Sequence, residues 1–229
     1  MTDESEVPVL AIDGPSGSGK GTIGQQIAAR HAWHFLDSGA LYRVLALAAL
    51  ESGVDFSDID ALVQLARNSD IHFVPRPGAT AEVYLDGKLV SERLRTEEAG
   101  RGASRVAAEP RIREALLQRQ RDFRRPPGLV ADGRDMGTTV FPNATLKIFL
   151  TASAEERAER RYKQLKEKGF SVNLARLLGE IRERDERDMN RSASPLRAAE
   201  DAIEVDTTGM SIEKVVDHID ELLQQRLSG

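Results

Sequence analysis

Short runs of apolar residues recur along the chain, and each run ends in polar or glycine-rich residues. The five runs cover residues 7–12, 33–36, 129–131, 146–150 and 202–205. A helical pattern of apolar positions follows each run, which is typical of strands that alternate with helices around a buried parallel sheet. The pattern therefore predicts an α/β fold with a five-stranded parallel sheet flanked by helices.

The segment between the second and third runs has a different pattern. Helical patterns occupy residues 40–51, 58–68, 97–107 and 110–124. In the middle of this segment, residues 71–74 and 82–85 are strand-like and flank a turn that contains Pro77 and Gly78. Asp86 and Gly87 then form a hairpin signal. We therefore predict a small antiparallel β lobe at about residues 70–93, inserted in the sequence of the sheet domain.

A glycine-rich loop directly follows the first apolar run and precedes a helical pattern. A loop in this position wraps backbone N–H groups around phosphate, and the positive end of the helix dipole adds to the attraction. Lys20 would reach the outer phosphates of a nucleoside triphosphate, and the Thr22 hydroxyl could bind Mg²⁺. The sequence thus predicts a P-loop fold that binds ATP or GTP through Gly14, Pro15, Ser16, Gly17, Ser18, Gly19, Lys20, Gly21 and Thr22.

The loop departs from the strict form of this motif, which places Ser or Thr directly after the lysine. Here Gly21 intervenes, and the hydroxyl comes one position later, at Thr22. This displacement favours a small-molecule or nucleotide kinase over a GTPase. Asp206 and Gly209 superficially match a D-x-x-G pattern, but they come late, and no Asn-Lys-x-Asp follows to select guanine. A glycine-rich turn without a ligand and a nucleotide sensor without transfer are the alternatives.

Composition excludes several kinds of functional site and partner. The chain has 229 residues, of which 30% are charged, with a net charge of −5 and no cysteine. The lack of cysteine excludes thiol nucleophiles, disulfides, iron–sulfur clusters and cysteine-based zinc sites. A mildly acidic balance does not attract nucleic acid or an anionic membrane, so we expect neither as a partner. Residues 1–6 are unlike a signal peptide, and no apolar run has membrane-spanning length, so we expect a cytoplasmic protein.

Arginine residues accompany the segments that follow the predicted strands. Ligands bind outside the carboxyl ends of parallel strands, which here are followed by residues 14–22, 37–39, 132–135 and 206–208. Transfer of a phosphoryl group to a second phosphate must bring two polyanions together, and guanidinium groups bind phosphate oxygens two at a time. The candidates are Arg43, Arg134, Arg157, Arg160, Arg161, Arg182, Arg184, Arg187 and Arg191.

These arginines also have simpler interpretations. Residues 155–168 and 182–188 are rich in possible ion pairs four residues apart, so each could be a solvated helix face. The six arginines between Arg111 and Arg125 raise the possibility of a nucleic-acid binder. The net acidity and the apolar stripe of that segment instead favour an ordinary amphipathic helix.

Five stretches resemble the bacterial-type cytidylate kinases: residues 12–22, 36–43, 131–138, 147–150 and 184–191. The stretches at 36–43 and 131–138 are much more particular to this family than the glycine-rich loop, and the resemblance covers nearly the whole chain. It implies a single P-loop kinase domain over residues 1–229. This domain would transfer the γ-phosphoryl group of ATP to CMP or dCMP with the help of Mg²⁺.

The resemblance also implies roles for individual residues. The CMP site would comprise Ser38, Arg43, Ser104, Arg113, Arg134, Asp135, Arg184, Asp188 and Arg191. The catalytic charges would be those of Lys20, Arg134, Arg184 and Arg191, and Arg157 and Arg161 would contact ATP. Asp37 and Asp132 could bind Mg²⁺ through water, beside Thr22. The acceptor-binding insertion would span about 38–126 and a short lid about 158–178, in a protein that we expect to be a monomer.

Cytosine presents an amino donor at N4 beside acceptors at N3 and O2, and the resemblance places Asp135 and Arg113 opposite this edge. Uracil has an acceptor at position 4 and a donor at N3, the reverse of cytosine, so it would leave buried polar groups unpaired. Other small P-loop kinases, with adenylate, uridylate or shikimate as the acceptor, are the alternatives within the enzymes.

Overall fold

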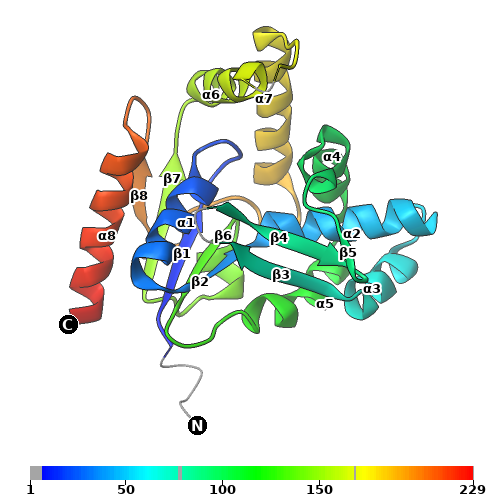
Figure 1. The fold of residues 1–229 in the computed structure, drawn as a ribbon, viewed down its shortest axis with the longest axis horizontal. Helices are drawn as coiled ribbons and strands as arrows, with labels where there is room; N and C mark the ends of the chain where they lie inside the picture. The colour runs from blue at the N-terminus through cyan, green and yellow to red at the C-terminus, as the bar shows by residue number, and fades with distance from the viewer. Residues whose placement is uncertain (1–6, 77–78, 168, 229) are drawn as a thin grey trace. The chain divides into compact units, whose positions relative to one another are not determined.

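The computed structural model describes residues 7–76, 79–167 and 169–228 (Figure 1). The chain divides into two compact units. One unit contains the chain up to Leu36 and from Phe123 onward, and the other is Asp37–Asp122. We call them the sheet unit and the insertion unit. Pro77 and Gly78, in the turn predicted from the sequence, and residues 1–6, with the predicted polar start, lie outside the described residues.

The sheet unit is built on a five-stranded sheet of order β2-β6-β1-β7-β8. Its strands are β1 (Val9–Asp13), β2 (His34–Asp37), β6 (Leu129–Gly133), β7 (Leu146–Thr151) and β8 (Ile203–Asp206). β1 pairs in parallel with β6 and β7, and β7 pairs in parallel with β8. Each of the five apolar runs forms one of these strands, so the predicted sheet is confirmed.

Two helices of the sheet unit cover one face of the sheet. α1 (Lys20–His31) places Ile23 and Ile27 on one side because residues four apart share a helix face. They pack against Leu10 and Ile148 of the strands, together with residues of α8 (Ile212–Ser228). The remaining helices of this unit are α6 (Ala154–Glu167), α7 (Leu174–Asn190) and the short π-helix η3 (Met136–Val140).

The other face of the sheet carries Ala11, Asp13 and Lys147, because side chains alternate along a strand and Lys147 lies opposite Ala11 in the register. Gly137 of η3 lies close against this face. A Cβ atom at Gly137 would be 3.1 Å from Lys147 Cδ and 3.4 Å from Asp13 Oδ2. A Cβ atom at this position would crowd both side chains, so the glycine eases the close approach of the chain to the sheet.

The insertion unit combines helices with a small antiparallel sheet. Its helices are α2 (Ser38–Ser52), α3 (Ile59–Asn68), η2 (Arg93–Arg95), α4 (Glu97–Val106) and α5 (Pro110–Arg121). The sheet has the order β3-β4-β5, with β3 (Ile71–Arg76), β4 (Ala79–Leu85) and β5 (Lys88–Leu89). The hairpin residues Asp86 and Gly87 have φ angles of 48° and 76°. The predicted β lobe is therefore confirmed.

α2 is buried on two sides because it serves two cores. Leu45 and other residues of α2 pack with α3, α4 and α5, while Val44 and Leu47 pack against Val83 and Leu85 of β4. This explains the nearly continuous apolar sequence of α2. Within the described ranges, no helix combines the length and the apolar character needed to cross a membrane. The acceptor role of the insertion and the lid at 158–178 stay predictions, and Lys168 of that lid lies outside the described residues.

Candidate active site

The phosphate loop, residues 14–22, leaves β1 by a turn that requires glycine. Gly14 has a φ angle of +146°, and a Cβ atom there would lie 2.1 Å from the backbone oxygen of Leu150. Any side chain at this position would therefore collide with the backbone of β7. The loop then leads into α1, whose first residue is Lys20. The sequence folds this way locally because Gly14 permits the turn and the loop ends at a helix N-terminus.

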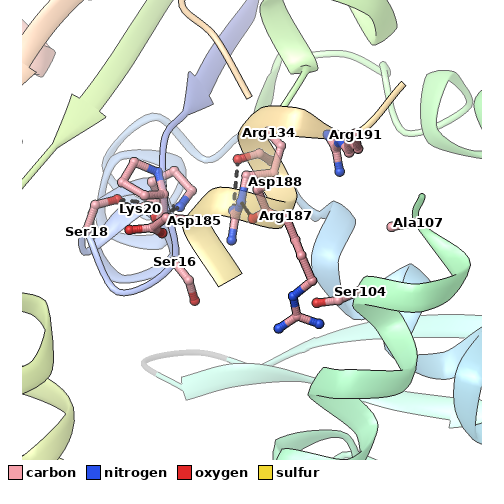
Figure 2. Close-up of polar contacts among 12 residues, drawn as sticks. Ser16, Ser18, Lys20, Ser104, Ala107, Arg134, Asp185, Arg187, Asp188 and Arg191 are labelled. Carbon is pink, nitrogen blue, oxygen red and sulfur yellow. Dashed lines mark hydrogen bonds and ion pairs between the residues drawn. The ribbon is translucent and has the colours of Figure 1, made fainter. Parts of the chain in front are cut away.

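The Lys20 side chain is folded back onto the loop (Figure 2). It is 5% exposed, and Nζ donates to the backbone oxygen of Pro15 at 2.7 Å and to Ser18 Oγ at 3.4 Å. Asp132 Oδ1, at the end of β6, is 4.0 Å from Nζ. Burial lowers the pKa of Lys20 to about 7, and the positive charge of Arg134 adds to this effect. Phosphate oxygens could replace these neutral partners of the ammonium group.

Arg157 of α6 supports the loop from the protein side. It is 4% exposed, and its Nη1 donates to the backbone oxygen of Ser16 at 3.0 Å. Nη1 and Nη2 also bind both carboxylate oxygens of Asp185, at 3.0 and 2.5 Å, and Nε donates to Ala152 O. All three guanidinium nitrogens thus have protein partners. The contact of Arg157 with ATP stays a prediction, and Arg157 tethers the loop to α7 in this structure.

Thr207, which follows β8, supports the loop at a second point. Its side chain is buried, and Oγ1 donates to the backbone oxygen of Thr151 at 3.0 Å and to that of Ser18 at 3.4 Å. Arg160 donates to the backbone oxygen of Thr207 at 2.8 Å and also pairs with Glu156. Three of the four predicted segments, 14–22, 132–135 and 206–208, therefore meet at the carboxyl ends of the strands in the sheet unit.

Asp13 holds residues 133–137, at the end of β6, which we call the acceptor turn because Arg134 and Asp135 are predicted to bind the acceptor. Asp13 Oδ1 accepts a hydrogen bond from the backbone N–H of Met136, and Oδ2 accepts one from that of Gly137, each at 2.8 Å. Burial raises the pKa of the Asp13 carboxyl to about 6, although the two N–H groups act in the opposite direction. The Asp13 carboxylate therefore accepts hydrogen bonds from the first two N–H groups of η3 and fixes the turn to the end of β1.

The side chains of the acceptor turn and of α7 form a charged cluster. Arg134 Nε donates to Asp188 Oδ2 at 2.9 Å, and Nη1 donates to Gly133 O at 3.2 Å (Figure 2). Burial alone would raise the pKa of Asp188, but the charges of Arg134, Arg184 and Arg191 hold it below its usual value. Three arginines that the sequence assigns to the CMP site thus act on one carboxylate of the sheet unit.

Other predicted residues of the sheet unit lie in varied surroundings. Asp135 is 3% exposed, directly after Arg134. Arg191 follows α7, and its Nε donates to the backbone oxygen of Ser194 at 2.6 Å. Arg161 is half-buried on α6. In contrast, Arg182 pairs with Glu155 at 2.6 Å and is mostly exposed, so the simpler interpretation as a surface ion pair holds for Arg182.

The remaining predicted CMP-site residues belong to the insertion unit. Arg43 Nη1 donates to the backbone oxygen of Leu94 at 2.7 Å, and Ser104 Oγ donates to that of Gly100 at 3.2 Å. Arg113 is 9% exposed, its Nη1 donates to Ala107 O at 3.0 Å, and its Cζ lies 5.4 Å from the centre of the Tyr42 ring. Ser38, the first residue of α2, is buried.

Comparison with known proteins agrees with these features. Residues 10–225 match the family model described as cytidylate kinase. The chain belongs to the cytidylate kinase family. A cytidylate kinase of Aeromonas salmonicida is 59% identical over 220 residues, covering 96% of this chain and 95% of that protein. A cytidylate kinase of Pseudomonas aeruginosa is 60% identical over 214 residues, covering 93% of each chain.

Two of the oxygen groups predicted for Mg²⁺ in this member of the cytidylate kinase family, those of Thr22 and Asp132, lie at the start of α1. Thr22 is exposed in the first turn, and a Cβ atom at Gly21 would lie 3.3 Å from Asp132 Oδ2, so this carboxylate packs directly against that turn. Asp37 Oδ1 accepts from Ala40 N and caps α2. In the part of the chain that the structure describes, no cluster of three acidic or histidine side chains could hold a metal by itself. The donors fit an ion held mainly by the phosphates of ATP.

Two carboxylates of the site were not found by sequence reasoning. Asp13 follows the first apolar run directly, and its position at the end of a buried strand was the available signal. Asp185 lies within the charged run 182–188, where nothing in the sequence distinguishes it from residues of a solvated face. Asp13 accepts hydrogen bonds from backbone N–H groups, and Asp185 binds the Arg157 side chain, in each case far away in the sequence.

Proposed function

We propose that this member of the cytidylate kinase family transfers the γ-phosphoryl group of ATP to CMP and dCMP. An oxygen of the acceptor phosphate bonds to the γ-phosphorus, the bond to the β,γ-bridging oxygen breaks, and ADP leaves with CDP or dCDP as the other product. The observation that carries this proposal is the arrangement within the sheet unit. It combines a phosphate loop containing a buried lysine with a carboxylate on which three arginines act.

The donor would be held by the loop. Its backbone N–H groups and the start of α1 face the phosphates, and Lys20 would exchange Pro15 O for an outer phosphate oxygen. Mg²⁺, held by the ATP phosphates with Thr22 and, through water, Asp132 and Asp37, would neutralise charge on the β- and γ-oxygens. Arg157 keeps the loop in place, and Arg161 would contact ATP from α6.

The acceptor would be held by side chains. Arg43, Arg134 and Arg191 would hold the CMP phosphate and, with Lys20 and Arg184, stabilise the charge that moves during transfer. Arg184 and Asp188 lie one helical turn apart on α7, so both could reach the ribose from one helix face. The resemblance adds Ser38, Ser104 and Arg113 of the insertion unit, and it gives Arg113 the second base-reading role.

Base selection would follow from polarity. Asp135 would accept a hydrogen bond from the N4 amino group of cytosine, and Arg113 would donate to N3. Both side chains are buried, and uracil would place an acceptor oxygen against the carboxylate and an N–H donor against the guanidinium group. A lid at about 158–178 would exclude water as a competing acceptor. We further infer that the protein acts as a monomer in the cytoplasm, with neither nucleic acid nor membrane as a partner.

The test is ADP production from Mg·ATP with CMP, dCMP, UMP, AMP and shikimate offered separately. We expect turnover with CMP and dCMP and little with the others. Faster turnover with AMP, UMP or shikimate would identify a different small-molecule kinase, and nucleotide binding without transfer to any acceptor would indicate a sensor. The base-reading role is tested by Asp135→Asn, and an unchanged preference for CMP over UMP would contradict it.

A further inference from the structure

Asp13 is a buried carboxylate that connects the two substrate-binding segments of the sheet unit. It is the last residue of β1, directly before the phosphate loop, and it is 4% exposed. Its two oxygens accept from Met136 N and Gly137 N across 123 and 124 residues of sequence. One side chain thus joins the start of the phosphate loop to the end of the acceptor turn.

These hydrogen bonds use both oxygens of an ionised carboxylate. An ionised carboxyl accepts on either oxygen, whereas a protonated one carries a hydrogen on one oxygen and accepts there only poorly. Two charge-assisted bonds from adjacent N–H groups also fix the orientation of the peptide planes that donate them. The peptide units that donate these bonds join Asp135 to Met136 and Met136 to Gly137, and Arg134 directly precedes Asp135.

The packing around Asp13 leaves the turn little freedom. Gly137 lies between Lys147 and Asp13, where a Cβ atom would be 3.1 Å from Lys147 Cδ and 3.4 Å from Asp13 Oδ2. Lys147 is itself buried and held by Asp201 at 2.8 Å. The turn is therefore fixed by the carboxylate on one side and by an anchored lysine side chain on the other.

We propose that Asp13 is a positioning residue for phosphoryl transfer, and that its ionised carboxylate aligns Arg134 and Asp135 of the acceptor turn with the phosphate loop. This inference rests on the proposed function, because it assigns the turn to the acceptor. Asp13 does not touch either substrate in this role. It acts through the backbone of Met136 and Gly137, and a displacement of about 1 Å in an aligned site costs on the order of 100-fold in rate.

Burial makes the ionised form of Asp13 sensitive to pH. The groups that face it are Lys20 from α1, Arg134 and Asp135 from the acceptor turn, and Lys147 from β7. Burial raises the pKa of Asp13 to about 6, with Asp135 adding to the rise and Lys20 opposing it. The two hydrogen bonds should therefore weaken as the pH falls through about 6, which is a signature that can be observed without turnover.

The first experiment compares Asp13→Asn with the wild type. The amide keeps the size of the carboxylate but turns one acceptor into a donor that faces a backbone N–H. We expect kcat/KM for CMP to fall on the order of 100-fold, while the Kd of a non-hydrolysable ATP analogue stays close to the wild-type value. The matched control is Asp217→Asn, which removes an exposed carboxylate from Arg30 and should leave both quantities unchanged. An equal loss of ATP-analogue affinity, or an unchanged kcat/KM, would overturn the positioning role.

The second experiment covers the case in which Asp13→Asn does not fold. Amide resonances of Met136 and Gly137 in the ¹⁵N-labelled wild type should shift together between pH 5 and 8, with a midpoint near 6. Gly137→Ala keeps the carboxylate but adds a Cβ atom in the crowded space, and should reproduce the loss in kcat/KM for CMP. Amides that do not titrate, or a Gly137→Ala variant with normal turnover, would refute the inference.

The two proposals fail in different ways. A wild-type protein that does not phosphorylate CMP refutes the proposed function, whatever the amide resonances show. A wild type that phosphorylates CMP, together with an equally active Asp13→Asn variant, refutes the positioning role alone.

Discussion

The phosphate loop and the acceptor turn are held in place by hydrogen bonds of opposite polarity. In the loop, cationic side chains bind backbone oxygens: Lys20 binds that of Pro15 and Arg157 binds that of Ser16. In the turn, a carboxylate binds backbone N–H groups, those of Met136 and Gly137. The protein therefore supports the loop through its carbonyl oxygens, whereas it supports the turn through two N–H groups.

Under the proposed function, this difference would let one sheet edge bind two phosphate-bearing substrates in different ways. Backbone N–H groups bind any polyphosphate, because every peptide unit carries the same donor. An acceptor turn whose N–H groups are already bonded must use side chains, and here these are Arg134 and Asp135. We infer that the donor site derives its affinity mainly from the backbone, whereas the acceptor site derives its selectivity from side chains.

The largest effect is expected for Lys20→Ala, which removes the cation of the loop. The substitution takes away the charge at the outer phosphates and should lower kcat by about 1,000-fold, or about 4 kcal/mol of transition-state stabilisation. The measurement is ADP formation with saturating CMP. Ser18→Ala is the control, because Ser18 Oγ also binds Lys20 and Pro15 but carries no charge. Loss of the same size in both variants would show that loop shape, not charge, is what matters.

A somewhat smaller effect is expected for Arg134→Ala, which tests whether the acceptor turn binds its substrate through side chains. The variant loses a charge at the proposed acceptor phosphate and the hydrogen bond from Arg134 Nε to Asp188. We therefore expect kcat/KM for CMP to fall by about 150-fold, or about 3 kcal/mol of transition-state stabilisation. ATP-analogue affinity should change much less. Arg182→Ala, which removes an exposed guanidinium from Glu155, is the matched control and should behave like the wild type.

Most of the fold could be predicted from the sequence because the information is local. Each strand of the large sheet is an apolar run bounded by polar or glycine residues, and the hairpin at Asp86 and Gly87 is signalled by its own turn residues. The phosphate loop has the same property, since its glycines, Lys20 and the following helix lie within one short segment. Local patterns therefore identified the donor half of the site.

The supporting carboxylates could not be predicted because their partners are distant. Asp13 meets N–H groups 123 and 124 residues later, and Asp185 meets Arg157 across 28 residues. In the sequence, Arg157 lies in a charged run between Glu156 and Glu159, so its burial against Asp185 is not visible. These contacts are defined only when the sheet and α7 have folded.

Asp185→Asn tests whether the tether of the loop is structural. The pair with Arg157 is buried, and removal of one charge leaves the guanidinium without a full counter-charge, so we expect a loss of about 2 kcal/mol in the free energy of unfolding. Chemical denaturation with and without an ATP analogue measures this loss. The analogue should bind less tightly to the variant, because Ser16 loses its fixed partner. Unchanged stability would show that Asp185 does not hold Arg157 in solution.

The smallest effect concerns the pH dependence of donor binding. Burial lowers the pKa of Lys20 to about 7 in the protein without nucleotide, and bound phosphates must raise it, because they favour the ammonium form. Below pH 7 the lysine already carries its proton. Above this value, binding must take a proton from solution, so the affinity for an ATP analogue should fall about fivefold between pH 7 and 8.

Calorimetry in buffers of different ionisation enthalpy measures this proton uptake directly. Uptake should approach one proton per site at pH 8 and decline toward pH 6, and Lys20→Arg should show none, because a guanidinium group stays charged throughout this range. An affinity that is constant from pH 7 to 8 in the wild type would mean that the lysine is charged before ATP arrives. In that case Asp132, 4.0 Å away, would offset the burial more strongly than the neutral oxygens of the loop imply.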